Sequence, residues 1–387
     1  MTLAAPAPAL PRAEAGDNLN AVAAWLLTCC AMIFAMVVIG GITRLTLSGL
    51  SITEWEPVTG VIPPLSHADW AAEFAKYQHI PQYKLLNAGM SLGDFKTIYL
   101  WEYVHRLWGR LIGVVYAVPL VYFLLRRRLP RRLVGPLAFI LLLGFGQGLL
   151  GWYMVESGLA NRVDVSQYRL TAHLALALLI YAAILWVALG ILRQPRTFKI
   201  VMPGLDPGIY APNGSGTARP SAADGRVKPG HDGQIARGWR RAGEVIIALV
   251  ALTITAGGFT AGLHAGLVYN TFPMMDGRFV PAGYAQLEPF FRNWFENVTA
   301  VQFDHRLLAE TTVASVLAAW CVGACTALPR PARGALHALA LVALLQLTLG
   351  VSTLLFVVPI PLAAAHQAGA VLLLTAAIAF RHRLRQA

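Results

Sequence analysis

Four histidines are the residues of this sequence most suited to chemistry, because each lies inside a long apolar stretch. They are found near the start of the second, fourth, sixth and eighth such stretches, at His105, His173, His305 and His366. An imidazole costs free energy in hydrocarbon, so a histidine within a membrane span is a functional hypothesis by default. One alone could simply hydrogen-bond to a neighbouring helix. Four in matching positions indicate a shared role.

The even-numbered stretches are predicted to be helices that run in the same direction, which places all four imidazoles at one level of the bilayer. Two helices that each offer an imidazole at that level can bind the iron of a flat macrocycle from both faces. The pairs His105/His173 and His305/His366 therefore predict two haem sites. A binuclear copper or zinc centre is disfavoured, because three of the four helices lack the further ligands that such metals recruit.

Glu102 and Gln302 break the match between the two haem-site sequences. Glu102 precedes His105 by three residues on the same helix face, whereas Gln302 holds the equivalent place before His305. A buried carboxylate is costly, so its presence in one half predicts that this half performs the chemistry while the other holds a redox cofactor. The alternative is an ion pair between Glu102 and Arg106, one helical turn further on, and both interpretations can hold together.

The elements that must position these residues are transmembrane helices. Hydrophobic residues make up 57% of the 387 positions and charged residues 13%, a composition too apolar for a soluble protein of this length. Crossing the hydrocarbon core takes about 20 apolar residues. Eight stretches meet this requirement, with centres near Phe34, Val115, Leu142, Ile180, Leu252, Val316, Leu344 and Leu373.

The chain repeats its features in one order when its halves are aligned on His105 and His305. The repeated segments are Gly40-Gly41-Ile42-Thr43 with Gly257-Gly258-Phe259-Thr260, and Gln147-Gly148-Leu149-Leu150-Gly151 with Gln346-Leu347-Thr348-Leu349-Gly350. Because each half has an even number of spans, both enter the membrane in the same sense, and the repeat axis should follow the membrane normal. The predicted fold is an all-α integral membrane protein whose eight transmembrane helices form two pseudo-symmetric four-helix bundles.

The order of these segments predicts four regions. Residues 1–20 form an N-terminal tail and residues 21–192 the first four-helix half. Residues 193–241 are rich in Pro, Gly and charge, which predicts a disordered cytoplasmic linker. Residues 242–387 form the second half. His264, near the outer end of the fifth stretch, has no counterpart in the first half and is expected to be peripheral.

The net charge of +12 indicates membrane topology rather than a nucleic-acid partner. Most Lys and Arg residues outside the spans fall in the two tails and in the second, fourth and sixth connections, and the sharpest cluster is the run 126–132. Cytoplasmic segments carry this excess of basic residues. The chain is therefore predicted to lie in the cell inner membrane, surrounded by lipid, with both termini in the cytoplasm.

Longer motifs in both halves identify a family. In the first half they are Gly40-Gly41-Ile42-Thr43-Arg44-Leu45, Ser48-Gly49-Leu50-Ser51, Gly60-Val61-Ile62-Pro63-Pro64-Leu65, and Trp101-Glu102-Tyr103-Val104-His105-Arg106. In the second half they are Asn270-Thr271-Phe272-Pro273-Met274-Met275, Phe295-Glu296-Asn297, Val301-Gln302-Phe303-Asp304-His305-Arg306, and His366-Gln367. With these motifs the chain resembles the haem A synthase family over nearly its whole length, in the form found in mitochondria and related bacteria. The cysteine pair that other members carry in outer loops is absent here, so no thiol-based step is expected.

The resemblance implies a role for each candidate residue. His305 and His366 would hold a haem b cofactor, and His105 and His173 would flank the site of the substrate, haem O, with Glu102 taking part in catalysis. The reaction would oxidise the C8 methyl group of haem O to a formyl group through a hydroxymethyl stage. The product, haem A, would serve assembly of an aa3-type cytochrome oxidase, and a farnesyltransferase, haem O synthase, would supply the substrate. The resemblance leaves the electron-transfer partner open and is compatible with a homo-oligomer.

Two other functions compete with this interpretation. A non-catalytic dihaem b-type cytochrome that transfers electrons from quinol would explain the four histidines, but not the difference between Glu102 and Gln302. A transporter built from two repeats would need helices broken in the middle of the membrane, whereas the glycine pairs lie at the ends of their spans.

Overall fold

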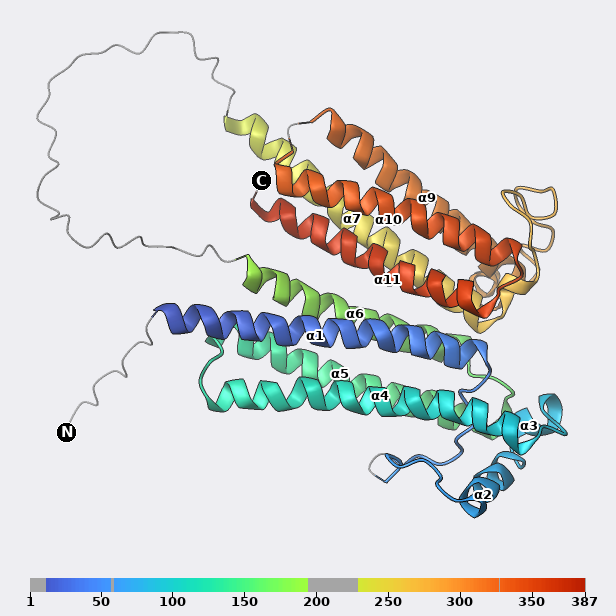
Figure 1. Ribbon diagram of the computed structural model, residues 1–387. Helices are drawn as coiled ribbons and strands as arrows, with labels where there is room; N and C mark the ends of the chain where they lie inside the picture. Colours follow the sequence, from blue (N-terminus) through green and yellow to red (C-terminus); the bar gives the residue numbers. More distant parts are fainter. Residues whose placement is uncertain (1–11, 57–58, 194–228, 327, 387) are drawn as a thin grey trace, which may run out of the picture.

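The computed structural model describes residues 12–56, 59–193, 229–326 and 328–386. Most of them form long helices that lie side by side (Figure 1). Within these ranges eight helices are long and apolar enough to cross a membrane, and no β-strand occurs. The eight are α1 (Arg12–Leu45), α4 (Leu92–Leu125), α5 (Arg131–Asn161), α6 (Gln167–Leu192), α7 (Pro229–Gly262), α9 (Val298–Ala324), α10 (Arg330–Leu355) and α11 (Ile360–Arg383). The predicted all-α class and the eight predicted spans are confirmed, and the chain is a multi-pass membrane protein.

Side-chain caps set the start of the two helices that carry His105 and His305. Ser91 precedes α4 in a capping box, in which its hydroxyl accepts from the Asp94 N–H at 3.2 Å and the Asp94 carboxylate accepts from the Ser91 N–H at 3.4 Å. Asn297 precedes α9, and its side chain accepts from two N–H groups of the first helical turn. The caps fix where each helix begins and therefore the depth at which its histidine lies.

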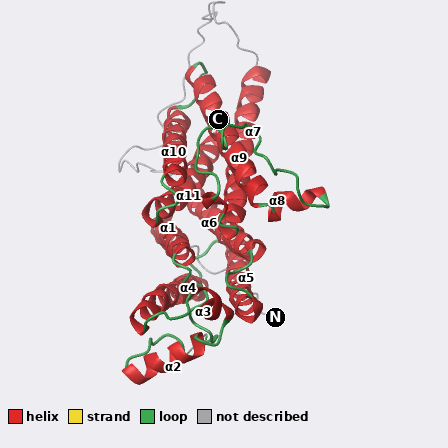
Figure 2. Cartoon of the chain, turned by 90° about the vertical axis from the view of Figure 1, so that its right-hand side faces the viewer, coloured by secondary structure: helices red, strands yellow, loops and turns green. Residues whose placement is uncertain are grey.

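The helix contacts of the first half recur in the second. In the first half α1 packs against α4 and α6, and α5 packs against α6; in the second α7 packs against α9 and α11, and α10 packs against α11. The halves meet where α6 contacts α7 and α11, and where α1 contacts α11. Figure 2 shows the two groups from one end of the bundle, with α6 and α11 between them.

The two ends of the bundle differ in structure. At one end α1 begins and α11 ends, while the other end carries α2 (His67–Tyr77), α3 (Pro81–Leu86) and the segment 263–297, which includes α8 (Asn293–Glu296) (Figure 1). The four imidazole-bearing helices all start at this second end. The sequence predicts that it faces away from the cytoplasm.

The connection between the halves differs in one respect from the predicted linker. Residues 194–228, which make up most of the predicted 193–241 segment, lie outside the described residues. Of the remainder, Arg193 caps the end of α6, and residues 229–241 are helical and form the first turns of α7. Proline is well tolerated in the first turn of a helix, because its missing N–H would have no partner there. Helix α7, the first span of the second half, therefore starts within the segment that the sequence predicted as a linker.

His264 joins the two halves at the outer end of the bundle, although the sequence predicted it to be peripheral. Its Nε2 lies 2.6 Å from an Asp164 carboxylate oxygen in the α5–α6 connection, and its Nδ1 lies 3.0 Å from Arg44 Nη2 at the end of α1. Arg44 also donates to the main-chain carbonyl of Ala261 on α7. The three side chains form one polar chain across the interface between the halves.

Replacing Asp164 with Asn should loosen this junction slightly. The ion pair is partly exposed, with side-chain exposures of 41% for His264 and 27% for Asp164, so solvent screening limits its value to about 1 kcal/mol. We expect the apparent Tm of the detergent-solubilised protein to fall by about 1–3 °C. Glu54→Gln is the matched control, because Glu54 pairs with Lys76 within one outer segment and should leave the Tm unchanged. If Asp164→Asn and the parent chain have the same Tm, the contact between His264 and Asp164 does not hold the halves together.

Candidate functional site

The structure brings the predicted histidines together in two pairs. His105 on α4 and His173 on α6 are close enough for their imidazoles to interact electrostatically, and the same holds for His305 on α9 and His366 on α11. All four side chains are half-buried inside their halves. Among the described residues, no group of three or more His, Cys, Asp or Glu side chains gathers at one point. Each half therefore offers two imidazoles as its candidate nitrogen donors.

A glycine on a neighbouring helix faces each imidazole. A Cβ added at that glycine would lie 3.3, 3.0, 2.9 or 2.8 Å from the ring Cε1 atom, in the pairs Gly40–His105, Gly151–His173, Gly257–His305 and Gly350–His366. At Gly257 and Gly350 the added atom would lie closer than real Cβ atoms come, and at Gly40 and Gly151 closer than most do, so each glycine gives its imidazole space. The sequence repeat contained all four glycines, but only the structure shows that they face the histidines.

Two glutamines hold the helices that carry the second histidine of each half. Gln147 Nε2 donates to the main-chain carbonyl of His173 at 3.0 Å, and Gln346 Nε2 donates to that of His366 at the same distance. An amide bond to a helix carbonyl inside a membrane restricts both rotation and sliding of that helix. Sequence reasoning marked these glutamines only as part of the repeat, and their recurrence was the available signal for a positional role.

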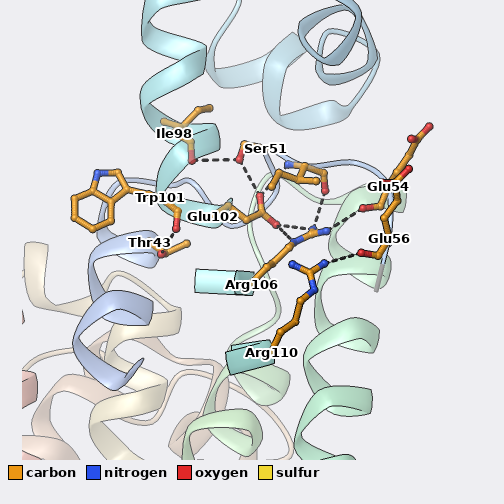
Figure 3. Close-up of polar contacts among 10 residues, drawn as sticks. Thr43, Ser51, Glu54, Glu56, Ile98, Trp101, Glu102, Arg106 and Arg110 are labelled. Carbon is orange, nitrogen blue, oxygen red and sulfur yellow. Dashed lines mark hydrogen bonds and ion pairs between the residues drawn. The ribbon is translucent and has the colours of Figure 1, made fainter. Parts of the chain in front are cut away.

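Glu102 is buried, with 2% of its surface exposed, and all its lone-pair positions are used (Figure 3). One carboxylate oxygen accepts from Arg106 Nη2 at 2.6 Å and Nε at 3.0 Å. The other accepts from Ser51 Oγ at 2.8 Å and from the Ile52 N–H at 2.9 Å. The ion pair with Arg106, which the sequence offered as an alternative, is therefore present. No hydrogen bond joins Glu102 to His105 in the described structure.

The segment that supplies Ser51 and Ile52 is held in place by its own small core. Ile52 packs with Tyr77, Phe95 and Tyr99, so the connection after α1 is fastened to α2 and to the start of α4. Burial raises the pKa of the Tyr77 hydroxyl, which accepts from Asn87 at 2.7 Å and donates to the Gln82 side chain at 2.9 Å. This packing keeps two donors aimed at the Glu102 carboxylate.

Arg106 and Arg306 hold the outer segments of their halves in equivalent ways. Arg106 donates to the carbonyls of Ile52 at 2.8 Å and Glu54 at 2.9 Å, and its guanidinium lies 5.4 Å from the Trp55 ring centre. Arg306 donates to two carbonyls of the segment after α7, those of Tyr269 at 2.5 Å and Thr271 at 2.7 Å. The helix that carries the first histidine of each half is therefore fastened to the loop above it.

Gln302 takes the place of Glu102 in this arrangement but without the charge. Its Nε2 donates to the Tyr269 carbonyl at 2.9 Å, while its buried Oε1 has no hydrogen-bond partner. The difference between the halves is thus a fully bonded carboxylate in the first and a neutral, partly bonded amide in the second. Both residues lie on the same helix as the first histidine of their halves, three residues before it, on α4 and α9.

These features define a polytopic, all-helical membrane protein with a pair of imidazoles inside each half. The COX15-CtaA family model, described as cytochrome oxidase assembly protein, matches residues 23–378. The chain belongs to this family, which confirms the resemblance seen in its motifs.

The names of similar proteins agree with this family assignment. The chain is 49% identical to a protein named heme A synthase from Nitrosospira multiformis, over 94% of each chain. It is 49% identical to a heme A synthase from Rhodospirillum centenum, over 95% of this chain and 89% of the relative. It is 41% identical to human heme A synthase COX15, over 94% of this chain and 83% of the human protein.

Proposed function

We propose that this chain is a haem A synthase, which oxidises the C8 methyl group of haem O to the formyl group of haem A for assembly of a cytochrome oxidase. The observation that carries the proposal is 49% identity, over 94% of each chain, to an enzyme of that name. One histidine within each of α4, α6, α9 and α11 supports it. The dihaem cytochrome is the less favoured alternative, because the relatives described above carry the name of the enzyme.

The residues of each half fit a haem. Two imidazoles without accompanying carboxylates or thiolates are a common axial ligand set of haem iron. The glycine facing each ring leaves room for the imidazole close to the helix backbone, and in the second half the ring nitrogens have further partners. We assign His305 and His366 to a haem b cofactor, and His105 and His173 to the site that receives haem O. When bound, haem b would supply one-electron transfer.

Glu102 acts in this proposal as a fixed negative charge beside the substrate site. Its four hydrogen bonds must be rearranged before it can accept a proton, because an ionised carboxylate offers about four lone-pair positions. Four donors that hold the charge in one place support electrostatic stabilisation instead, in which the carboxylate favours positive charge developing at the methyl carbon. Arg106 offsets the cost of burying that charge.

The reaction removes four electrons from the methyl carbon in two stages. In each stage the carbon loses two electrons, two protons pass to solvent, and a water molecule supplies the oxygen. The first stage gives the hydroxymethyl group and the second gives a hydrated aldehyde, which loses water to form the formyl group. The chain's own contribution is to bind and orient the macrocycle, to keep the methyl carbon near the Glu102 charge and to exclude bulk water. The electrons leave to an external acceptor, and haem O synthase supplies the substrate.

Co-expression with a haem O-forming farnesyltransferase tests the proposal directly. We expect chromatography of the extracted haems to show haem A when both proteins are present. Cells with the farnesyltransferase alone should contain haem O without haem A, and cells with this chain alone should contain haem B only. Haem B and unconverted haem O from the doubly expressing cells would favour the dihaem cytochrome and overturn the enzyme.

A further inference from the structure

The two halves differ in how their imidazoles are held. In the second half His305 Nδ1 lies 3.1 Å from the main-chain carbonyl of Thr253, which is one helical turn before Gly257 on α7. The carbonyl of a helical residue has a second lone pair beyond its helix bond, and the missing Cβ of Gly257 lets the ring approach closely enough to use it.

His366 has the equivalent arrangement on α10. Gln346 lies one helical turn before Gly350, and its main-chain carbonyl accepts from the His366 imidazole as the Thr253 carbonyl does from His305. The Gln346 side-chain Nε2 lies 3.1 Å from His366 Nδ1 but is itself a donor, and it bonds to the His366 main-chain carbonyl instead. In both rings of the second half the engaged nitrogen is therefore Nδ1. Neither Nε2 atom has a hydrogen-bond partner among the described residues, so Nε2 is the nitrogen available to a metal.

The first half has the glycines but not these hydrogen bonds. His173 Nδ1 is buried without a partner, although Gln147 and Gly151 stand where Gln346 and Gly350 do in the second half. His105 has no hydrogen-bond partner in the described ranges, and its Nε2 rather than its Nδ1 is the nearer nitrogen to a Cβ built at Gly40, at 3.5 Å against 4.0 Å. The first-half imidazoles also lie slightly farther from their glycines than the second-half ones do.

We infer that Gly257 and Gly350, with the main-chain carbonyls of Thr253 and Gln346, are positioning residues that make the second-half haem site a permanent one. A metal-binding histidine whose other ring nitrogen is bonded to the protein is held in one orientation and one tautomer, and losing such a partner typically lowers metal affinity about 10–100-fold. The first-half rings lack these partners and accept a haem that can leave again. This inference rests on the proposed function, in which haem b is retained and haem O is exchanged.

The test compares haem loss from glycine variants of the full-length protein purified with its haem b. Gly257→Ala and Gly350→Ala place a methyl group where the imidazole lies, which displaces Nδ1 from its partner. We expect transfer of haem b to apomyoglobin to become about 10-fold faster or more, with shifted g-values in the electron paramagnetic resonance spectrum of the ferric haem. Gly151→Ala, in the first half, should release haem b at the parental rate. Gly148→Ala controls for a helical Gly→Ala change, because nothing lies within 4 Å of its added Cβ.

Two results would overturn the inference. One is parental haem loss and unchanged spectra in Gly257→Ala and Gly350→Ala, and the other is equally fast loss in Gly151→Ala. If the second-half glycine variants do not fold, the unaltered chain loaded with haem in both halves should lose one haem to apomyoglobin about 10-fold faster than the other, and a single common rate counts against the inference. Haem A formation by the parent chain is measured separately, and its absence would contradict the proposed enzyme. Haem A formation together with equal haem-loss rates in the parent chain and the second-half glycine variants would contradict only the positioning role.

Discussion

Glu102→Gln should abolish haem A formation while the protein keeps its haem b. The change removes the buried charge that we place beside the methyl group, and the loss of one such electrostatic group typically slows a reaction about 100–1000-fold. Haem b should stay because Glu102 contacts neither His305 nor His366. Chromatography of haems extracted from the co-expressing cells measures the first effect, and the haem b content of the purified protein measures the second.

Stability must be followed in the same variant, because Glu102→Gln leaves the Arg106 guanidinium without its ion pair. Arg106 has only 12% side-chain exposure, and breaking a buried pair costs about 3–5 kcal/mol. Ser51→Ala is the matched comparison, since it removes one of the four donors and keeps the charge. We expect it to lower haem A output only about 5-fold, in line with about 1 kcal/mol for one hydrogen bond. Full haem A output from a folded Glu102→Gln protein would remove the carboxylate from the mechanism.

His366→Ala should eliminate bound haem b from the purified protein, and His173→Ala should retain it. Loss of one of two axial ligands removes the bond that holds the iron on that face, whereas His173 lies in the other half and contacts a different glycine. Both variants should fail to make haem A. His366→Ala lacks the haem b cofactor, and His173→Ala lacks a ligand of the substrate site. The visible absorption spectrum and the haem-to-protein ratio separate the two cases.

His337→Ala provides the matched control for a histidine lost from a transmembrane helix. His337 lies on α10 and accepts from Trp320 Nε1 at 2.8 Å, away from both imidazole pairs. It should therefore keep haem b and haem A formation. The assignment of cofactor and substrate to separate halves fails if His173→Ala loses haem b as completely as His366→Ala does.

The loop contacts suggest why each first histidine is followed by arginine. Arg106 and Arg306 each fasten the segment above their helix by bonds to two of its carbonyls. Carbonyl oxygens that faced the membrane without a partner would cost several kcal/mol each, so a buried guanidinium with five donors is well suited to this position. The helix that positions the imidazole and the loop that covers it then move as one unit.

The sequence by itself determined the class of the protein, the number of its spans, the four histidines, the Glu102/Gln302 difference and the family. All of these are local patterns: an apolar run long enough for the bilayer, a polar residue inside it, or a short motif. Each depends on residues that are neighbours in the chain, and the hydrocarbon environment penalises alternatives strongly enough for the pattern to decide.

Only the tertiary structure decided which groups meet. The donors to Glu102 at Ser51 and Ile52 lie in another segment, and no spacing rule connects them to α4. The same is true of the link from His264 to Asp164 and Arg44, and of the glycine that faces each imidazole. Whether a ring nitrogen reaches a carbonyl depends on differences of tenths of an ångström in helix packing, because hydrogen bonds weaken steeply with distance and angle. The two halves share a sequence pattern, and their packing makes them different.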